Sequence, residues 1–199
     1  AELLESIVAE TPTVVGITCL TAFYKETIEL SQMLKETGLR VIIGGVHPTF
    51  LPQETLAESG CDYVVLGEGE IALLKLLQNN FQSDSIAGVY SIKDFEDSKP
   101  VIKKGKKIEN LDDIPFPDWE QLNPNLYPKA PHGAIVKNFP VAPVITTRGC
   151  PYECTFCASP SFYDRKIRFR SPENVIQEIK YLVDHINNFN WFTHLQNKN

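Results

Sequence analysis

Three cysteines lie close together near the C-terminal end of the 199-residue sequence, at Cys150, Cys154 and Cys157. The segment that carries them, TTRGCPYECTFC, has the spacing C-x3-C-x2-C and follows an apolar run that we expect to be a strand. Thiolates are the usual ligands of iron–sulfur clusters, and three of them leave one iron of a four-iron cluster without a protein ligand. The spacing therefore predicts a [4Fe–4S] cluster whose open iron can bind a substrate or cofactor.

A zinc site in a non-catalytic metal- or cofactor-binding module is the alternative for these thiols. A structural zinc site needs four protein ligands, and the fourth would have to come from His132 or His185. The remaining cysteines, Cys19 and Cys61, lie in or beside apolar runs, and we interpret them as small buried hydrophobes. An odd set of cysteines with three crowded together fits a metal site in a reducing compartment better than a disulfide framework.

Composition and charge restrict the class of protein. With 43% hydrophobic residues the chain can bury a core, and no run approaches the ~20 apolar residues of a membrane span. The first residues lack the layout of a secretory signal, so we expect a cytoplasmic protein. Residues 1–137 hold 12 basic and 20 acidic side chains, whereas residues 138–199 hold 7 and 5. General nucleic-acid binding by the first part is therefore disfavoured.

Apolar runs alternate with helical patterns in the first half of the chain. We predict strands at 13–19, 41–43 and 62–66, helices at 23–34, 53–58 and 70–80, and a small β element over 86–108. Strands that are apolar throughout, alternating with helices, are typical of an α/β fold with a parallel sheet covered on both faces. We therefore expect a Rossmann-like domain over 1–109, a Pro-rich linker over 110–140 and a second domain over 141–199.

The second domain is expected to begin with a strand at 141–145, followed by the cysteine loop and by a helix from Pro172. The run Asp164–Arg170 could bind a carboxylate or an anionic substrate. A half-buried edge strand with one solvated face is the more common reason for such a run, and we favour it for Lys166.

Small and polar residues follow the three predicted parallel strands. Ligands of such sheets bind beyond the carboxyl ends of the strands, and the candidate binding residues there are Thr18, Gly44, Gly45, Gly67, Glu68 and Gly69. Glycines let the backbone approach a large flat ligand, and a helix that begins at Glu70 favours an anion at its N-terminus. Ordinary strand-to-helix turns explain the same residues equally well, with Glu68 complementing the helix dipole.

The segment TTRGCPYECTFCASP resembles the signature of the radical S-adenosylmethionine (SAM) superfamily, with Phe156 in its aromatic position. The resemblance implies that Cys150, Cys154 and Cys157 hold the [4Fe–4S] cluster, that SAM binds the open iron, and that Phe156 lies near the adenine. Reductive cleavage of SAM would then generate a 5′-deoxyadenosyl radical that acts on a small-molecule substrate. It further implies an electron donor such as flavodoxin or ferredoxin and, over 141–199, the first part of a TIM-like partial βα barrel.

Upstream segments resemble the subfamily of radical SAM proteins that carries an N-terminal cobalamin-binding domain. These segments are TVVGITCLT, VIIGGVHPTFLP, DYVVLGEGE, IENLDDIPFPDW and RFRSPENVIQEI, the last of which includes Arg168 and Arg170. The resemblance implies cobalamin as a further cofactor, for methyl transfer or cyclisation. The D-x-H-x-x-G motif of many cobalamin domains is absent, so we expect His47 to be a loop residue and not a cobalt ligand.

Two further expectations follow from the comparison with that subfamily. A methylthiotransferase would carry a second cysteine triad upstream, where only Cys19 and Cys61 are available. The chain also lacks the first strands of the cobalamin domain and the later strands of the barrel, so we expect a fragment that does not turn over SAM by itself.

Overall fold

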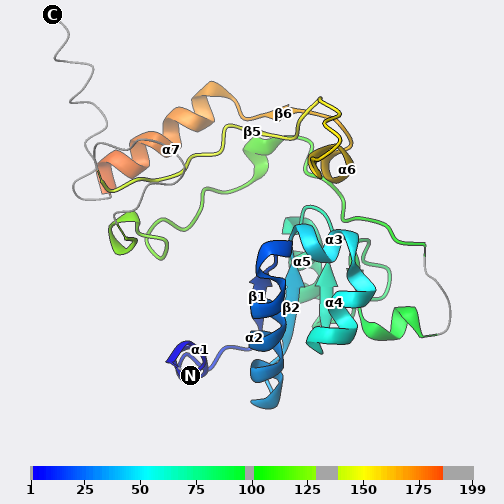
Figure 1. Ribbon diagram of the computed structural model, residues 1–199. Helices are drawn as coiled ribbons and strands as arrows, with labels where there is room; N and C mark the ends of the chain where they lie inside the picture. Colours follow the sequence, from blue (N-terminus) through cyan, green and yellow to red (C-terminus); the bar gives the residue numbers. More distant parts are fainter. Residues whose placement is uncertain (1, 97–100, 129–138, 186–199) are drawn as a thin grey trace, which may run out of the picture. The chain divides into compact units, whose positions relative to one another are not determined.

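The computed structural model describes residues 2–96, 101–128 and 139–185, which divide into two compact units (Figure 1). The first unit comprises the described residues of Ala1–Ile108 and of Tyr152–Arg165, and the second those of Glu109–Pro151 and of Lys166–Asn199. Within these ranges no helix is long and apolar enough to cross a lipid bilayer.

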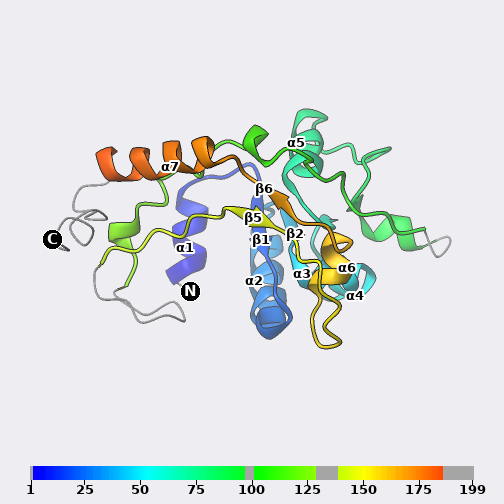
Figure 2. The ribbon, with the colours of Figure 1, turned by 90° about the horizontal axis from the view of Figure 1, so that it is seen from above.

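A four-stranded sheet in the order β1-β2-β3-β4 forms the centre of the first unit. The strands β1 (Val15–Thr18), β2 (Val41–Gly44) and β3 (Tyr63–Val65) are parallel, and β4 (Val89–Tyr90) runs antiparallel to β3. The strands β1 and β2 lie side by side (Figure 2). Their register pairs Thr18 with Gly44. The predicted α/β fold with a parallel sheet is confirmed, and the parallel strands end at the same edge.

Helices connect the parallel strands. The unit contains α1 (Glu2–Ala9), α2 (Tyr24–Glu36), α3 (Val46–Phe50), α4 (Pro52–Ser59), α5 (Glu70–Gln78) and α6 (Ser159–Tyr163). Proline is well suited to the first position of α4, because its missing N–H would have no partner there. The helix ends at Gly60, which caps it at φ 64°, in the left-handed region that glycine enters without a steric penalty.

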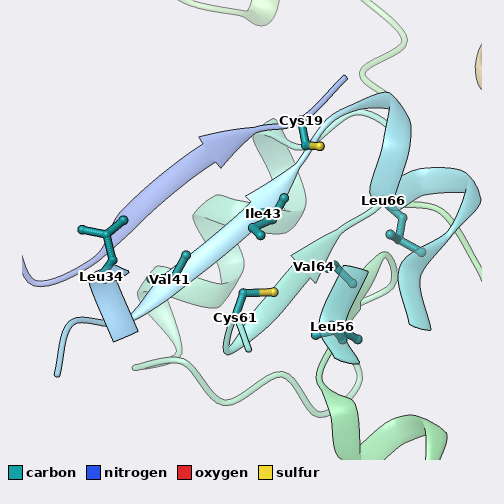
Figure 3. Packing of buried hydrophobic residues seen from close by; sticks show 8 residues of the cluster. All are labelled: Cys19, Leu34, Val41, Ile43, Leu56, Cys61, Val64 and Leu66. Carbon is teal, nitrogen blue, oxygen red and sulfur yellow. The ribbon is translucent and has the colours of Figure 1, made fainter. Parts of the chain in front are cut away.

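The core lies on both faces of the sheet because β2 is apolar at successive positions. Val41 and Ile43 point to one face, where Leu34 of α2 and Leu56 of α4 cover them (Figure 3). Ile42 points to the other face, where it packs in a cluster with Val65 of β3 and with Ala72 and Leu76 of α5. Because successive side chains of a strand point to opposite faces, all three apolar residues of β2 are buried in the core.

Two cysteines belong to this core, as the sequence predicted. Cys19 is fully buried and Cys61 is 5% exposed (Figure 3). Burial raises the pKa of Cys61 from 9.0 to about 11. Both thiols are therefore packing groups, and Cys61 stays protonated near neutral pH.

The second unit has few regular elements. It contains a short antiparallel pair, β5 (Thr147–Arg148) with β6 (Arg168–Phe169), followed by α7 (Pro172–His185), where the helix was expected. The strand predicted at 141–145 does not form, and pairing begins only at Thr147. Pro143, which has no N–H to donate to a ladder, lies in the middle of that segment.

Residues 110–128, predicted to be part of a linker, pack within the second unit instead. Trp119 is 5% exposed, and its indole N–H donates to Glu178 of α7 at 3.1 Å. The amide of Ser171 donates to the Asp112 carboxylate at 2.9 Å. The sequence did not reveal these contacts, because the segment is rich in proline and its few apolar residues, among them Leu111 and Trp119, follow no regular period. The rest of the predicted linker includes 129–138, outside the described residues.

The β element predicted over 86–108 also differs. Its first half, β4, pairs with β3, and no strand forms over 101–107. Residues 103–107 instead lie against the chain that follows β3, because the amide of Gly105 donates to the carbonyl of Leu66 at 2.9 Å.

Candidate functional site

A pocket of about 360 Å³ opens at the carboxyl ends of the parallel strands in the first unit. Its lining includes five of the six strand-end residues singled out from the sequence, namely Thr18, Gly44, Gly45, Gly67 and Gly69. The sixth, Glu68, is buried and is not part of the lining. The structure thus brings together residues at or just after the ends of three strands, because the parallel strands end at one edge.

Two glycines leave the floor of the pocket empty. A Cβ atom added at Gly16, in the middle of β1, would meet no atom within 4 Å, and one added at Gly44 would meet only Val65. Any larger residue at these positions would project a side chain over the sheet. Gly16 was not singled out from the sequence, although a glycine inside a strand is a known signal of close approach by a ligand or another chain segment.

The rim of the pocket is fixed by contacts between its loops. Gly45 has φ 105°, and a Cβ atom there would lie 2.7 Å from the carbonyl oxygen of Cys19, so only glycine fits. The hydroxyl of Thr49 donates to the carbonyl of Gly45 at 2.7 Å and accepts from the amide of Gly67 at 2.9 Å. Thr49, which sequence reasoning did not single out, therefore links two glycine loops of the pocket.

His47 lies beside this rim, in α3, so the prediction of a loop residue is wrong. The side chain is 3% exposed, and its ring stacks on Tyr24 with the centroids 3.8 Å apart. Its Nδ1 lies 3.2 Å from the Thr21 hydroxyl, and its Nε2 lies 3.5 Å from the Glu54 carboxylate without a hydrogen-bond partner. His47 is not part of the pocket lining.

The cysteine loop begins at a position that requires glycine. Gly149 has φ 98°, and a Cβ atom there would lie 1.9 Å from the carbonyl oxygen of Lys166. The pairing of Arg148 with Arg168 closes the base of the loop. The chain therefore turns sharply just before Cys150, which is partly buried and reduced.

The other two thiols belong to the first unit and are exposed. The amide of Cys157 donates to the carbonyl of Cys154 at 3.0 Å in a tight turn. The hydroxyl and the amide of Ser159 donate to the Cys157 sulfur and hold the pKa of this thiol below its usual range. Phe156, between them, is 91% exposed.

The three thiols are divided between the units, with Cys150 in the second and Cys154 and Cys157 in the first. Among residues 2–96, 101–128 and 139–185, no group of three or more His, Cys, Asp or Glu side chains is close enough to hold a metal ion. His185 stacks on Tyr181 and lies 3.0 Å from its carbonyl oxygen, whereas His132 lies outside the described residues.

In the second unit, Arg170 is occupied by internal contacts. Its guanidinium pairs with Glu178, which is 1% exposed, and it donates to Asn174 at 2.7 Å and to the carbonyl of Ile145 at 2.9 Å. These contacts support the segment that leads into the cysteine loop. Lys166 is exposed, as expected for a solvated position, whereas Arg168 is buried.

Comparisons with protein families give two matches to this chain. Residues 1–77 match the family described as B12 binding domain, and residues 144–194 match the family described as Radical SAM superfamily. The two matches occur in the order expected from the sequence.

The curated relatives are longer than this chain. It is 32% identical over 175 residues to an uncharacterized methyltransferase of Pyrococcus horikoshii, covering 86% of this chain and 37% of the relative. It is 35% identical over 196 residues to the anaerobic magnesium-protoporphyrin IX monomethyl ester cyclase of Rubrivivax gelatinosus, covering 92% of this chain and 33% of the relative. The chain thus spans about a third of the length of these relatives.

The fold resembles that of a solved enzyme. The radical SAM methyltransferase TsrM of Kitasatospora setae, solved with cobalamin and a [4Fe–4S] cluster bound, matches with a TM-score of 0.61 at 19% identity. The match covers 93% of this chain and 38% of that one.

Proposed function

Because the chain belongs to the radical SAM proteins that carry a B12-binding domain, we propose that it forms the cobalamin-binding and cluster-binding part of a radical SAM enzyme. The whole enzyme would act on a small-molecule substrate by methyl transfer or cyclisation. The observation that carries the proposal is a glycine-lined pocket and a three-thiol loop on one chain, each with the donors or the space that its cofactor needs.

The pocket fits part of a large cofactor such as cobalamin. Its floor is open where Gly16 and Gly44 lack side chains, and its rim exposes backbone at Gly45 and Gly67. Such a cradle suits the approach of a bulky, partly flat group, which would be held by backbone contacts and shape. The N-terminus of α5, close to Gly69, adds a weak preference for an anionic group such as a phosphate.

The cysteine loop fits a [4Fe–4S] cluster by its donor chemistry. Cys150, Cys154 and Cys157 are reduced, and none of them is fully buried. Hydrogen bonds from Ser159 favour the thiolate of Cys157, the form that binds iron. Metal binding commonly orders its own ligands, so the thiols need not converge before the cluster is loaded.

Within this assignment, each group has a separate task. The cluster would supply an electron to SAM bound at its open iron, which is the chemistry that this family implies. The exposed ring of Phe156 offers a flat apolar surface to the adenine. An external electron donor such as a flavodoxin or ferredoxin would reduce the cluster.

Anaerobic reconstitution of the full 199-residue chain with iron and sulfide tests the cluster assignment. We expect iron and sulfide in the ratio of a [4Fe–4S] cluster, and an electron paramagnetic resonance signal after reduction that changes when SAM is added. The variant with Cys150, Cys154 and Cys157 replaced by Ala should lose the bound iron. The matched control with Cys19 and Cys61 replaced by Ala should keep it, and equal iron contents in the two variants would contradict the proposal.

A further inference from the structure

Two lysines attach the cysteine loop to the rest of the first unit. The ammonium group of Lys107 pairs with the Asp164 carboxylate, and that of Lys104 lies 3.6 Å from the same carboxylate. Lys104 also donates to the carbonyl of Ser161 in α6. Both lysines thus meet the end of the segment that carries Cys154 and Cys157.

The backbone between these lysines is fixed against the pocket. Gly105 donates to Leu66, and a Cβ atom at Gly105 would lie 2.9 Å from the carbonyl oxygen of Glu68. The side chain of Lys104 is close enough to Gly67 that a Cβ atom there would lie 3.1 Å from it. Residues 104–107 therefore lie between the loop that follows β3 and the end of the cysteine loop.

The partner of the lysines lies at a strained turn. Asp164 and Arg165 have φ values of 52° and 57°, in the left-handed region, and they reverse the chain after α6. Arg165 pairs with Glu153, the residue before Cys154, so it connects the two ends of segment 152–165. The lysines also hold the pKa of Asp164 below its usual range, Lys107 more than Lys104.

The two other lysines of the sequence Lys103-Lys104-Gly105-Lys106-Lys107 behave differently. The side chains of Lys103 and Lys106 are exposed, whereas those of Lys104 and Lys107 are 31% and 18% exposed. A run of lysines on a surface is commonly a solvated face, and Lys103 and Lys106 fit that description. The contacts with Asp164 set the other two apart.

We propose that Lys104 and Lys107 are positioning residues of the cysteine loop, which hold segment 152–165 against the loop that follows β3. The lysines restrict Cys154 and Cys157 before iron binds and so reduce the ordering that cluster binding requires. The inference rests on the proposed function of the thiols as cluster ligands. It adds a connection between the pocket and the cluster loop within the first unit.

Hydrogen exchange in the metal-free full chain tests the contact directly. The Lys104→Met/Lys107→Met variant removes both ammonium groups but keeps the apolar stems. We expect the amides of segment 152–165 to exchange about two to five times faster in this variant than in the wild type. This factor corresponds to the stabilisation that exposed ion pairs typically provide. The matched control, Lys103→Met/Lys106→Met, removes the same charge from the same segment and should leave this exchange unchanged.

Iron release supplies the second readout. After reconstitution, we expect iron to pass to a chelator several times faster from Lys104→Met/Lys107→Met than from the control variant. Asp164→Asn, which keeps a residue that tolerates a left-handed conformation, should reproduce a similar acceleration of exchange if the double variant misfolds. Equal exchange in the two lysine pairs, whether fast or slow, would overturn the inference. Failure of the wild type to bind iron would refute the proposed function, whereas exchange in metal-free protein still decides the contact.

Discussion

Replacement of Gly16 by valine should separate ligand binding from stability in the glycine-lined pocket. An added Cβ atom at Gly16 meets no atom within 4 Å, so the substitution creates no clash in the free protein. Glycine inside a strand costs about 0.5–1 kcal/mol relative to alanine, and a β-branched residue suits a strand. We therefore expect the free energy of unfolding to stay the same or to rise by up to about 1 kcal/mol.

The same side chain should interfere with cobalamin. The two methyl groups of the introduced valine would project into a pocket of about 360 Å³ that we assign to the cofactor. Forcing extra methyl groups into a packed contact costs about 1–3 kcal/mol, which is roughly a 5- to 150-fold loss of affinity. Gly16 lies in β1, whereas Thr13 lies just before it and outside the lining, so Thr13→Val is a suitable control.

Equilibrium titration with hydroxocobalamin, followed by absorbance, measures the affinity, and urea denaturation followed by circular dichroism measures the stability. Gly16→Val should bind more weakly without a loss of stability, and Thr13→Val should resemble the wild type. A folded Gly16→Val variant that binds hydroxocobalamin as tightly as the wild type would refute the assignment of the pocket.

Three other predictions concern stability. Gly45→Ala should lower the free energy of unfolding by about 1–3 kcal/mol in urea denaturation, because φ is 105° and a Cβ atom would meet the Cys19 carbonyl oxygen at 2.7 Å. Glu178→Ala should destabilise the second unit by about 3–5 kcal/mol, since it leaves Arg170 without its buried partner; an unchanged denaturation midpoint would contradict this. As the pH rises from 9 toward 11, the wild type should lose about 1–3 kcal/mol more stability than Cys61→Ala, because the folded state keeps the Cys61 proton while the unfolded state releases it; parallel pH profiles would count against this.

The sequence could predict the features that depend on local patterns. Apolar runs that alternate with helical patterns were sufficient to predict a parallel sheet. Residues at or just after the predicted strand ends, such as Thr18, Gly44 and Gly67, line the pocket. The spacing of the cysteines identified the candidate cluster ligands in the same way. Each of these patterns lies within a short stretch of residues, so it can be recognised in a single sequence.

Other features required the tertiary structure because they join residues far apart in the chain. Gly16 lines the pocket because β1 pairs with β2 in a register that places it opposite Ile42, another residue of the lining. Asp112 and Ser171 are 59 residues apart, and their hydrogen bond helps to place the Pro-rich segment in the second unit. The division of the lysine run into two exposed and two engaged side chains depends on where Asp164 lies.

The sequence by itself thus determined which chemical groups the chain offers: three thiols, strand-end glycines and an apolar sheet. The tertiary structure decided which of these groups face a common space and which are used up by internal contacts, as Arg170 is by Glu178. The physical reason is that residue type and spacing set local conformation, whereas the environment of a side chain depends on strand order and on segments that pack from elsewhere in the sequence.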